Sequence, residues 1–403
     1  MTLLASAFLA APALAQTPHW IGAWEASPTA RTSVQTVSGT LTYRAKLTLS
    51  GDQVRLRFYN EGGDTPLLID AASIAVMDRA GKLGKAHLLS FAAARSLRLP
   101  PDTGVLSDSV SVDVRAGSDL IVSLYVSAPT RLGRAAPIPT LYAPGTDIIS
   151  APDRLKSAQT IGRPLLTAIE VRTRAPARVI VAFGDSITDS SVAISPDLRG
   201  WPERLARRLE AAGGTRTAVV NAGIGGNRLN AGSRNLFGGI SALDRFDRDV
   251  LQVPGVTHVV IAEGINDIGL SAGTETLSGE GAIQPVRPVP SAENLIAALS
   301  QLAARAHARG LKVICATITP FEGTTGTAAT PYYTPEKNAV RLKVNAWIRQ
   351  SSAFDGVIDF DRVLRDPARS DRMRDDLVGT DHLHPNSAGQ DVMAAAIDLG
   401  LFR

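Results

Sequence analysis

The pattern of apolar and polar positions divides the chain into two parts with different periodicities. From about residue 178 onward, short apolar runs alternate with longer amphipathic segments, which is typical of strands and helices in alternation. The apolar runs predict strands over 178–183, 217–220, 257–262, 311–318 and 356–360. The amphipathic segments predict helices over Trp201–Ala212, Ala292–Arg309, Pro335–Gln350 and Ser387–Leu399. This alternation favours a parallel sheet that is covered by helices on both faces.

The part of the chain before residue 170 shows little helical periodicity. Apolar and polar residues alternate in Val54–Tyr59 and Val110–Val114, and Leu120–Val126 has a high β-propensity. Short strands separated by Gly-, Pro- and Asp-containing turns predict an all-β sandwich of the jelly-roll type. The predicted domains are a β-sandwich over 16–170, a linker over 171–177 and an α/β domain over 178–403. We expect residues 19–32 to pack onto the α/β domain.

The first residues form an apolar stretch that is too short to span a bilayer. It ends in Ala13-Leu14-Ala15, which fits the small-x-small pattern of signal peptidase sites, although no Lys or Arg lies next to Met1. We interpret residues 1–15 as a signal peptide, and we expect an exported protein, periplasmic or extracellular, without stable membrane insertion. Cys315 is the only cysteine, so no intrachain disulfide exists, and its apolar neighbours predict a buried strand thiol.

Composition narrows the classes of function. The length of 403 residues favours two domains, and an apolar content of 44% is that of a globular protein. The net charge is only +4, and no dense cluster of Lys and Arg with interleaved aromatic residues occurs. We therefore expect no nucleic-acid partner. The sequence points to no particular protein partner.

Four short blocks of polar and glycine residues carry the candidate chemistry. Gly184-Asp185-Ser186, the glycine-dense turn 221–227 and the block that contains Asn266 each follow a predicted strand. A fourth block, Asp381-His-Leu-His384, directly precedes the last predicted helix. Because the carboxyl ends of parallel strands meet at one edge of a sheet, the first three blocks are expected to converge.

The order of serine, glycine turn, asparagine and Asp-x-x-His resembles the SGNH (GDSL-type) hydrolase family over roughly residues 176–403. The resemblance implies a five-stranded parallel sheet in a flavodoxin-like, three-layer α/β domain, and it implies an ester hydrolase. A serine hydroxyl needs a base to take its proton, and the base needs a carboxylate that fixes its tautomer. We therefore interpret Ser186 as the nucleophile, His384 as the base and acid, and Asp381 as the orienting carboxylate.

The same resemblance implies the donors of an oxyanion hole. They are the Ser186 N–H, the Gly226 N–H and the side-chain amide of Asn266. Gly226 is chosen among the glycines of its turn because it matches the family's Asn-x-x-x-x-Gly spacing from Asn221. Loss of one such donor typically lowers the rate by ~10²–10³-fold.

The same blocks contain residue types that are also found in metal sites and in dinucleotide-binding loops. Asp381, His382 and His384 are residue types that bind metals, but no second cluster completes a ligand shell, so we expect no metal. The turn 223–226 suggests a dinucleotide loop. The Gly-x-Gly-x-x-Gly spacing fails there because position 228 is Arg, and we expect no cofactor.

A narrower resemblance suggests the substrate. The segments Trp20–Trp24, Glu263–Gly269 and Tyr332–Glu336, together with the β-domain, look like the secreted branch of the family grouped with xylan-associated esterases. This similarity implies a short-chain, acetyl esterase that acts on carbohydrate or aryl esters, either small molecules or a polysaccharide. The alternatives are a lipase or lysophospholipase, and, in another class, a carbohydrate-binding protein whose SGNH domain is inert.

Two long loops on the active edge of the sheet are expected to contact the substrate. They span residues 270–290 and 320–334, and the second contains Tyr332 and Tyr333. Aromatic rings offer a flat amphipathic surface to sugars and aryl groups, so we expect both tyrosines on the alcohol side of the substrate.

Overall fold

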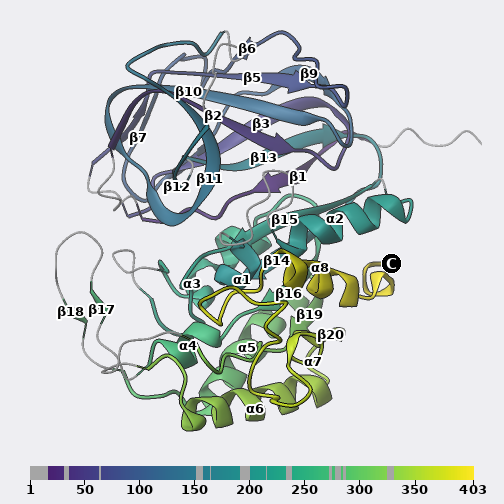
Figure 1. Ribbon diagram of the computed structural model, residues 1–403. Coiled ribbons are helices and arrows are strands. Elements are labelled where there is room, and N and C mark those ends of the chain that lie inside the picture. The colour runs from purple at the N-terminus through teal and green to yellow at the C-terminus, as the bar shows by residue number, and fades with distance from the viewer. Residues whose placement is uncertain are drawn as a thin grey trace, which may run out of the picture.

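The computed structural model has an antiparallel β region stacked on an α/β region (Figure 1). The structure describes residues 17–30, 36–62, 65–150, 158–163, 165–190, 200–214, 216–232, 238–271, 275–276, 283–284, 287–324 and 331–403. The predicted signal peptide lies outside the described residues, as does much of the loop 270–290 and the middle of the loop 320–334.

The β region consists of two larger sheets and one small one. Its strands are β1 (His19–Glu25), β2 (Thr36–Lys46), β3 (Gly51–Tyr59), β4 (Leu67–Ile69), β5 (Ala71–Met77), β6 (His87–Leu88), β7 (Leu97–Leu99), β8 (Gly104–Leu106), β9 (Val110–Val114), β10 (Asp119–Arg131), β11 (Gly133–Pro144), β12 (Ala158–Arg163) and β13 (Leu166–Thr173). One sheet has the order β1-β13-β3-β8, with β9 also on β3, and the other has the order β12-β11-β2-β10-β5-β6. The strands β4 and β7 pair separately.

Alternation along the strands explains why the two larger sheets share one core. Leu56 and Phe58 of β3 and Val122 and Leu124 of β10 are fully buried in the same hydrophobic cluster, while the residues between them on β3 are partly exposed. The strand-rich character of this region agrees with the sequence. The jelly-roll connectivity stays a prediction. Strand β13 continues to Thr173, which is in register with His19 of β1, so it occupies the first residues of the predicted linker 171–177.

Five parallel strands form the centre of the α/β region, as predicted. They are β14 (Arg178–Gly184), β15 (Thr217–Gly223), β16 (Val256–Ala262), β19 (Lys312–Ala316) and β20 (Gly356–Ile358). Their order is β15-β14-β16-β19-β20, which is the flavodoxin-like order 2-1-3-4-5 when the strands are counted along the chain. This order reverses direction at β14, so the site expected for a ligand lies at the carboxyl end of β14 and its two neighbours.

Helices cover both faces of this sheet. They are α1 (Ser186–Asp189), α2 (Trp201–Ala211), α3 (Ala242–Phe246), the π-helix η2 (Asp247–Leu251), α4 (Ile265–Gly269), α5 (Ala292–His307), α6 (Pro335–Gln350), α7 (Phe360–Leu364), α8 (Ser387–Ala396) and the 3-10 helix η3 (Leu399–Phe402), and the hairpin β17 (Glu275–Thr276)–β18 (Ile283–Gln284) lies apart from the sheet. Helices α2, α7 and α8 pack together on one face, whereas α3, α5 and α6 pack on the other (Figure 1). In the described part of the chain, no helix is long and apolar enough to cross a membrane.

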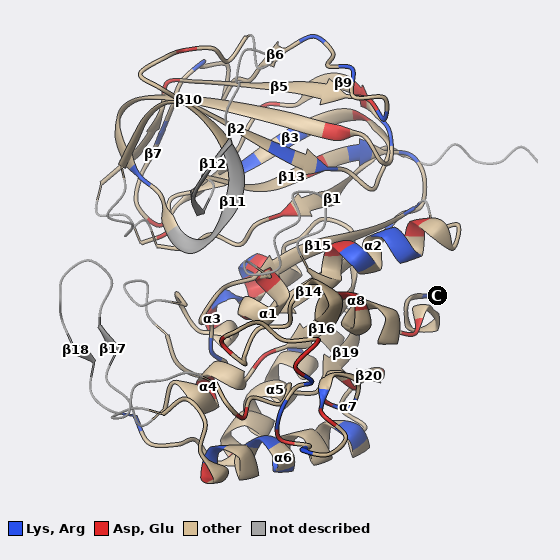
Figure 2. Ribbon diagram, in the orientation of Figure 1, with Lys and Arg blue, Asp and Glu red and all other residues tan. Residues whose placement is uncertain are grey.

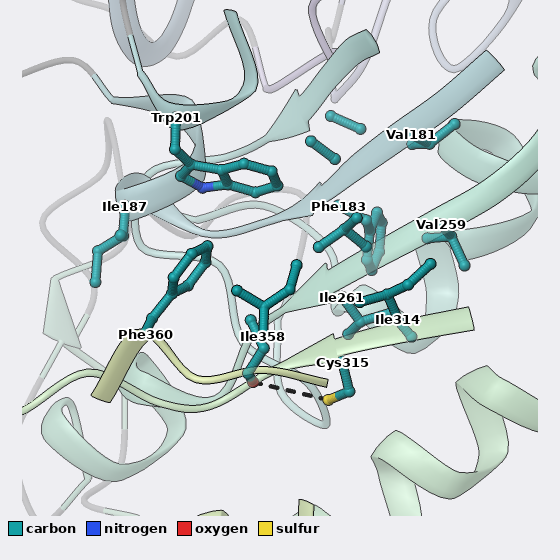
Figure 3. Packing of buried hydrophobic residues seen from close by; sticks show 14 of the residues in the cluster. Val181, Phe183, Ile187, Trp201, Val259, Ile261, Ile314, Cys315, Ile358 and Phe360 are labelled. Atoms are coloured by element: carbon teal, nitrogen blue, oxygen red, sulfur yellow. Dashed lines mark hydrogen bonds between the residues drawn. The ribbon is translucent and has the colours of Figure 1, made fainter. Parts of the chain in front are cut away.

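The core is packed against both faces of β14, whose residues from Val179 to Phe183 are fully buried. Figure 3 shows Trp201 of α2 beside Phe360 of α7, with ring centroids 5.6 Å apart. Phe183 packs edge-to-face on Phe246 at 5.3 Å on the side of α3. Cys315 is buried in β19 as predicted, and burial raises the pKa of its thiol. The strand that leads to Ser186 is therefore fixed on both sides.

Strand β1 joins the two regions along an edge of the parallel sheet. Its Ile21 is buried in the α/β core, and the Gly22 N–H donates to Pro254 O at 2.8 Å. Just beyond β1, Ala26 forms a parallel bridge with Asn221 of β15. An open edge strand can pair with another chain, and the contact with this segment covers the edge strand β15. Within the predicted segment 19–32, Ile21, Gly22 and Ala26 contact the α/β region, whereas Ala23 and Trp24 pack in the core of the β region, and residues 31 and 32 lie outside the described residues.

Candidate active site

Ser186 lies where β14 turns into α1. Asp185 is the N-cap of this short helix, because its side chain accepts a hydrogen bond from the Ile187 N–H at 2.9 Å. A Cβ atom on Gly184 would lie 2.3 Å from Thr188 Oγ1 and 2.6 Å from Ala262 O, so only glycine permits this close turn. Burial raises the pKa of Asp185 to about 7. The local structure thus presents the partly exposed Ser186 side chain at the edge of the sheet.

The three residues predicted as nucleophile, base and orienting carboxylate form one hydrogen-bonded chain. His384 Nε2 lies 2.8 Å from Ser186 Oγ, and His384 Nδ1 lies 2.6 Å from Asp381 Oδ2. A carboxylate only accepts hydrogen bonds, so Nδ1 carries the proton and Nε2 is left to accept the Ser186 hydroxyl proton. This arrangement can generate a serine nucleophile.

The turn that carries Asp381 and His384 is fixed by its own backbone. Asp381 Oδ1 accepts hydrogen bonds from the N–H groups of Leu383 and His384, both at 3.0 Å. Partial burial raises the pKa of Asp381, but the hydrogen bonds from His384 and Leu383 outweigh it and hold the pKa below its usual range. The carboxylate therefore stays ionised. Asn386 caps the following helix, because its side chain accepts a hydrogen bond from the Gly389 N–H.

His382 does not belong to this chain of hydrogen bonds. Its backbone has φ of +54°, in the left-handed region, because it occupies the tight turn between Asp381 and His384. Among the described residues, no group of three or more His, Cys, Asp or Glu side chains is placed to hold a metal ion. Both ring nitrogens of His384 are engaged by protein side chains, which favours the serine chemistry at this cluster over the metal alternative.

The two predicted backbone donors follow the carboxyl ends of the neighbouring strands β14 and β15. Gly226 has φ of +78°, which suits glycine, and it follows β15 in the turn that ends at Asn227. Within the described residues, neither the Gly226 N–H nor the Ser186 N–H has a hydrogen-bond acceptor. Unused donors at the edge of a sheet are suited to receive a developing negative charge.

The amide of Asn266 has one donor left for a ligand. Asn266 lies in the first turn of α4, directly after β16. Its Oδ1 accepts from the Tyr332 hydroxyl at 2.9 Å, and one of its N–H groups donates to Asn227 O at 3.0 Å. A primary amide has two N–H groups, so one remains without an acceptor in the part of the chain that the structure describes.

The structure places Tyr332 differently from the prediction. Its side chain is 8% exposed, and its ring lies against Gly269, where a Cβ atom would be only 2.1 Å from the ring. Among the described residues the ring is thus largely enclosed and offers little open surface to a sugar, and the hydroxyl instead holds Asn266. Tyr333 is partly buried and packs edge-to-face on Phe321 at 5.2 Å, and its contact with a substrate stays a prediction.

Sequence reasoning missed Arg245, whose side chain is completely buried. Its guanidinium donates to Gly184 O at 2.9 Å, to Ala222 O at 2.7 Å and to Asn227 Oδ1 at 2.7 Å. It thereby ties the end of β14 to the end of β15 and to the turn that contains Gly226. The i,i+4 spacing to Asp249 was the available signal, but it is equally typical of an exposed helical ion pair.

Two buried acidic side chains also link the loops that follow the strands. Glu263 at the end of β16 pairs with Arg245 at 3.2 Å. Asp267 accepts from the N–H groups of Leu229 and Asn230, at 2.8 and 3.3 Å, which links the Asn266 block to the chain after the glycine turn. Burial raises the pKa of Asp267 to about 6. The three strand ends are thus held to one another by side chains.

Comparisons with known proteins agree with this geometry. The model of the GDSL-like lipase/acylhydrolase family matches residues 182–392, just over half of the chain, and the protein belongs to this family. No curated protein sequence matches the chain.

Several solved structures are similar to part of this chain. A putative lipolytic protein of the G-D-S-L family from Desulfitobacterium hafniense is 20% identical, with 54% of this chain and 96% of that chain covered and a TM-score of 0.38. The lipase/acylhydrolase from Enterococcus faecalis is 24% identical, with 54% and 92% covered and a TM-score of 0.38. An acetyl xylan esterase, AlAXEase, is 19% identical, with 54% and 96% covered and a TM-score of 0.38.

The hydrogen bond between Tyr332 and Asn266 gives a direct prediction. Tyr332→Phe keeps the ring and removes only the hydroxyl, so it should lower kcat for ester hydrolysis by about two- to ten-fold, the net worth of one hydrogen bond. KM should stay near the wild-type value because the bond orients a donor and does not touch the ground-state substrate. Tyr142→Phe is the control: it removes a hydroxyl that donates to Ser38 O at 2.8 Å in the β region, and it should leave kcat unchanged. Equal rates for the wild type and Tyr332→Phe would contradict this role.

Proposed function

We propose that the protein is an exported serine ester hydrolase that works through an acyl-Ser186 intermediate. The observation that carries this proposal is the chain of hydrogen bonds from Ser186 to His384 to Asp381, at 2.8 and 2.6 Å. Membership of the GDSL-like lipase/acylhydrolase family supports acyl-transfer chemistry. The apolar segment 2–15 with its Ala-Leu-Ala end supports export.

The proposed reaction follows from the geometry of these groups. As Ser186 Oγ attacks the ester carbonyl, its proton passes to His384 Nε2, and the ionised Asp381 stabilises the imidazolium. The carbonyl oxygen becomes an oxyanion that accepts from the N–H groups of Ser186 and Gly226 and from the Asn266 amide. Collapse of this intermediate expels the alcohol, which takes the proton from His384. A water molecule then attacks the acyl-enzyme with the same base and releases the acid.

For the substrate we propose short acyl groups, acetyl above all, on carbohydrate or aryl alcohols. The similarity to the secreted, xylan-associated branch of the family supports this choice. The proposed donors lie in segments rich in glycine and polar residues: Gly226 belongs to the glycine-dense turn 223–226 and is followed by the buried Asn227, and Asn266 is followed by the buried Asp267. Such surroundings leave little apolar surface for a long acyl chain. A lipase or lysophospholipase would need that surface.

The nucleophile is tested by substitution. Ser186→Ala should lower hydrolysis of p-nitrophenyl acetate by several orders of magnitude, since removal of a triad nucleophile costs about 10⁶-fold in kcat in a well-studied serine protease. The circular dichroism spectrum should not change, because Ser186 is partly exposed and packs no core. A serine-directed phosphonate should label the wild type at Ser186 and leave the variant unlabelled. Near-normal turnover by Ser186→Ala would rule out the mechanism.

A panel of esters tests the substrate class. The value of kcat/KM should fall by about ten-fold or more as the acyl chain grows from acetyl to octanoyl, since each misfitted methylene is worth about 1–3 kcal/mol. Acetylated xylan should release acetate, and a lysophospholipid should be a poor substrate. A preference for octanoyl esters would favour the lipase alternative. Binding of xylan without hydrolysis of any ester would favour the carbohydrate-binding alternative.

A further inference from the structure

The β region contributes a buried acidic side chain to the α/β region. Glu61 follows β3 and forms an ion pair with Arg248 of η2, with Oε2 and Nη1 2.5 Å apart. The Glu61 side chain is 3% exposed and the Arg248 side chain 19% exposed. Figure 2 shows acidic and basic segments close together where the two regions face each other. A pair this well shielded from water is screened much less than a surface pair, and removal of one partner leaves a buried charge uncompensated.

The β region also contacts the same arginine, Arg248, through an aromatic ring. The Arg248 guanidinium carbon lies 5.3 Å from the centroid of the Tyr59 ring, within the range of a cation–π interaction. Glu25 at the end of β1 also lies at this junction. Burial and then the charge of Asp249 raise the pKa of Glu25 well above its usual value. Among the described residues, Glu61 is the acidic side chain of the β region that forms an ion pair with Arg248.

From Arg248 the ion pairs continue toward the strand ends. Arg248 binds Asp249 with two hydrogen bonds, at 2.5 and 3.0 Å, and Asp249 binds Arg245 at 3.0 Å. Asp249 and Arg245 are both buried, with side chains at most 1% exposed. Burial raises the pKa of Asp249, but Arg248 and Arg245 outweigh it and lower the pKa below its usual value. Asp249 is thus an ionised link between the two guanidinium groups.

The last member of the series, Arg245, contacts the loops of the candidate active site. It donates to Gly184 O, two residues before Ser186, and to Asn227 Oδ1, directly after Gly226. We propose that Glu61 is a positioning residue for the oxyanion donors, acting through Arg248, Asp249 and Arg245. The β region would then be part of the catalytic scaffold and not only an appended module.

The physical reason is the rigidity of paired guanidinium groups. A guanidinium held on two sides by carboxylates has one orientation, because its donors form a planar fork. Without the charge of Glu61, Arg248 keeps an ion pair on one side only, with Asp249, and the Tyr59 ring does not fix the direction of its donors, so Arg248 can turn, which loosens Asp249 and then Arg245. A misplacement of reacting groups by about 1 Å can cost up to 10²-fold in rate. The effect should therefore appear in the chemical step.

This inference rests on the proposed function, but different experimental results would contradict the inference and the function. Glu61→Gln should lower kcat for p-nitrophenyl acetate by about ten-fold, a coupling within the range seen for contacting residues in ion-pair networks. KM should change by less than about two-fold, and the rate of phosphonate labelling at Ser186 should fall in parallel with kcat. A purely structural role for Glu61 would lower the melting temperature without this split between kcat and KM.

The matched control is Glu210→Gln. Glu210 of α2 pairs with Arg79 of the β region at 3.0 Å, so it also joins the two regions, but this pair is exposed, with side chains 39% and 68% accessible. The Glu210→Gln variant should leave kcat and KM unchanged. Glu61→Asp, which keeps the charge, should recover most of kcat, and it serves as the second variant should Glu61→Gln fail to fold.

The outcomes separate the claims. Normal kcat in Glu61→Gln, an equal loss in Glu61→Gln and Glu210→Gln, or a Glu61→Asp variant that falls as far as Glu61→Gln would each overturn the positioning role. A wild-type protein that hydrolyses no ester and resists the phosphonate would instead overturn the proposed function.

Discussion

One buried guanidinium holds the candidate active site together. Arg245 binds the backbone at the ends of β14 and β15, the side chain of Asn227 and the carboxylate of Glu263 at the end of β16. A parallel sheet fixes its strands only up to their carboxyl ends, and beyond them each loop must be positioned by other contacts. The serine, the glycine turn and the asparagine each belong to a different loop. Their common geometry therefore depends on a side chain that reaches all three.

That requirement explains the charges around Arg245 and the place of the β region. A buried cation is costly unless a carboxylate pairs with it. Asp249, whose pKa is held below its usual value by Arg248 and Arg245, supplies that carboxylate, and Glu263 accepts a further hydrogen bond from Arg245. Asp249 in turn binds Arg248, which turns toward Glu61 of the β region. Strand β1 adds a second attachment by covering β15, the edge strand that leads to the glycine turn. The β region thus contacts the same part of the sheet through both charge and backbone.

The sequence predicted the parts of this structure that depend on periodicity and on motif order. The five parallel strands, their order and the four long helices follow from apolar patterning and from the family resemblance, and Ser186, His384 and Asp381 meet as expected. The short helices α1, α3, α4 and α7 were missed because five residues or fewer show no helical period. Arg245 was missed because arginine is normally exposed, and only tertiary contacts show it to be buried. Tyr332 was assigned to the substrate because nothing local shows that its hydroxyl reaches Asn266.

The claim that three loops converge on one oxyanion is best tested by a crystal structure of the phosphonate-inhibited protein. Phosphorus should be bonded to Ser186 Oγ, and one phosphoryl oxygen should lie about 2.7–3.1 Å from the N–H groups of Ser186 and Gly226 and from Asn266 Nδ2. An adduct at another residue would contradict the account. So would a phosphoryl oxygen that points to solvent or contacts other donors.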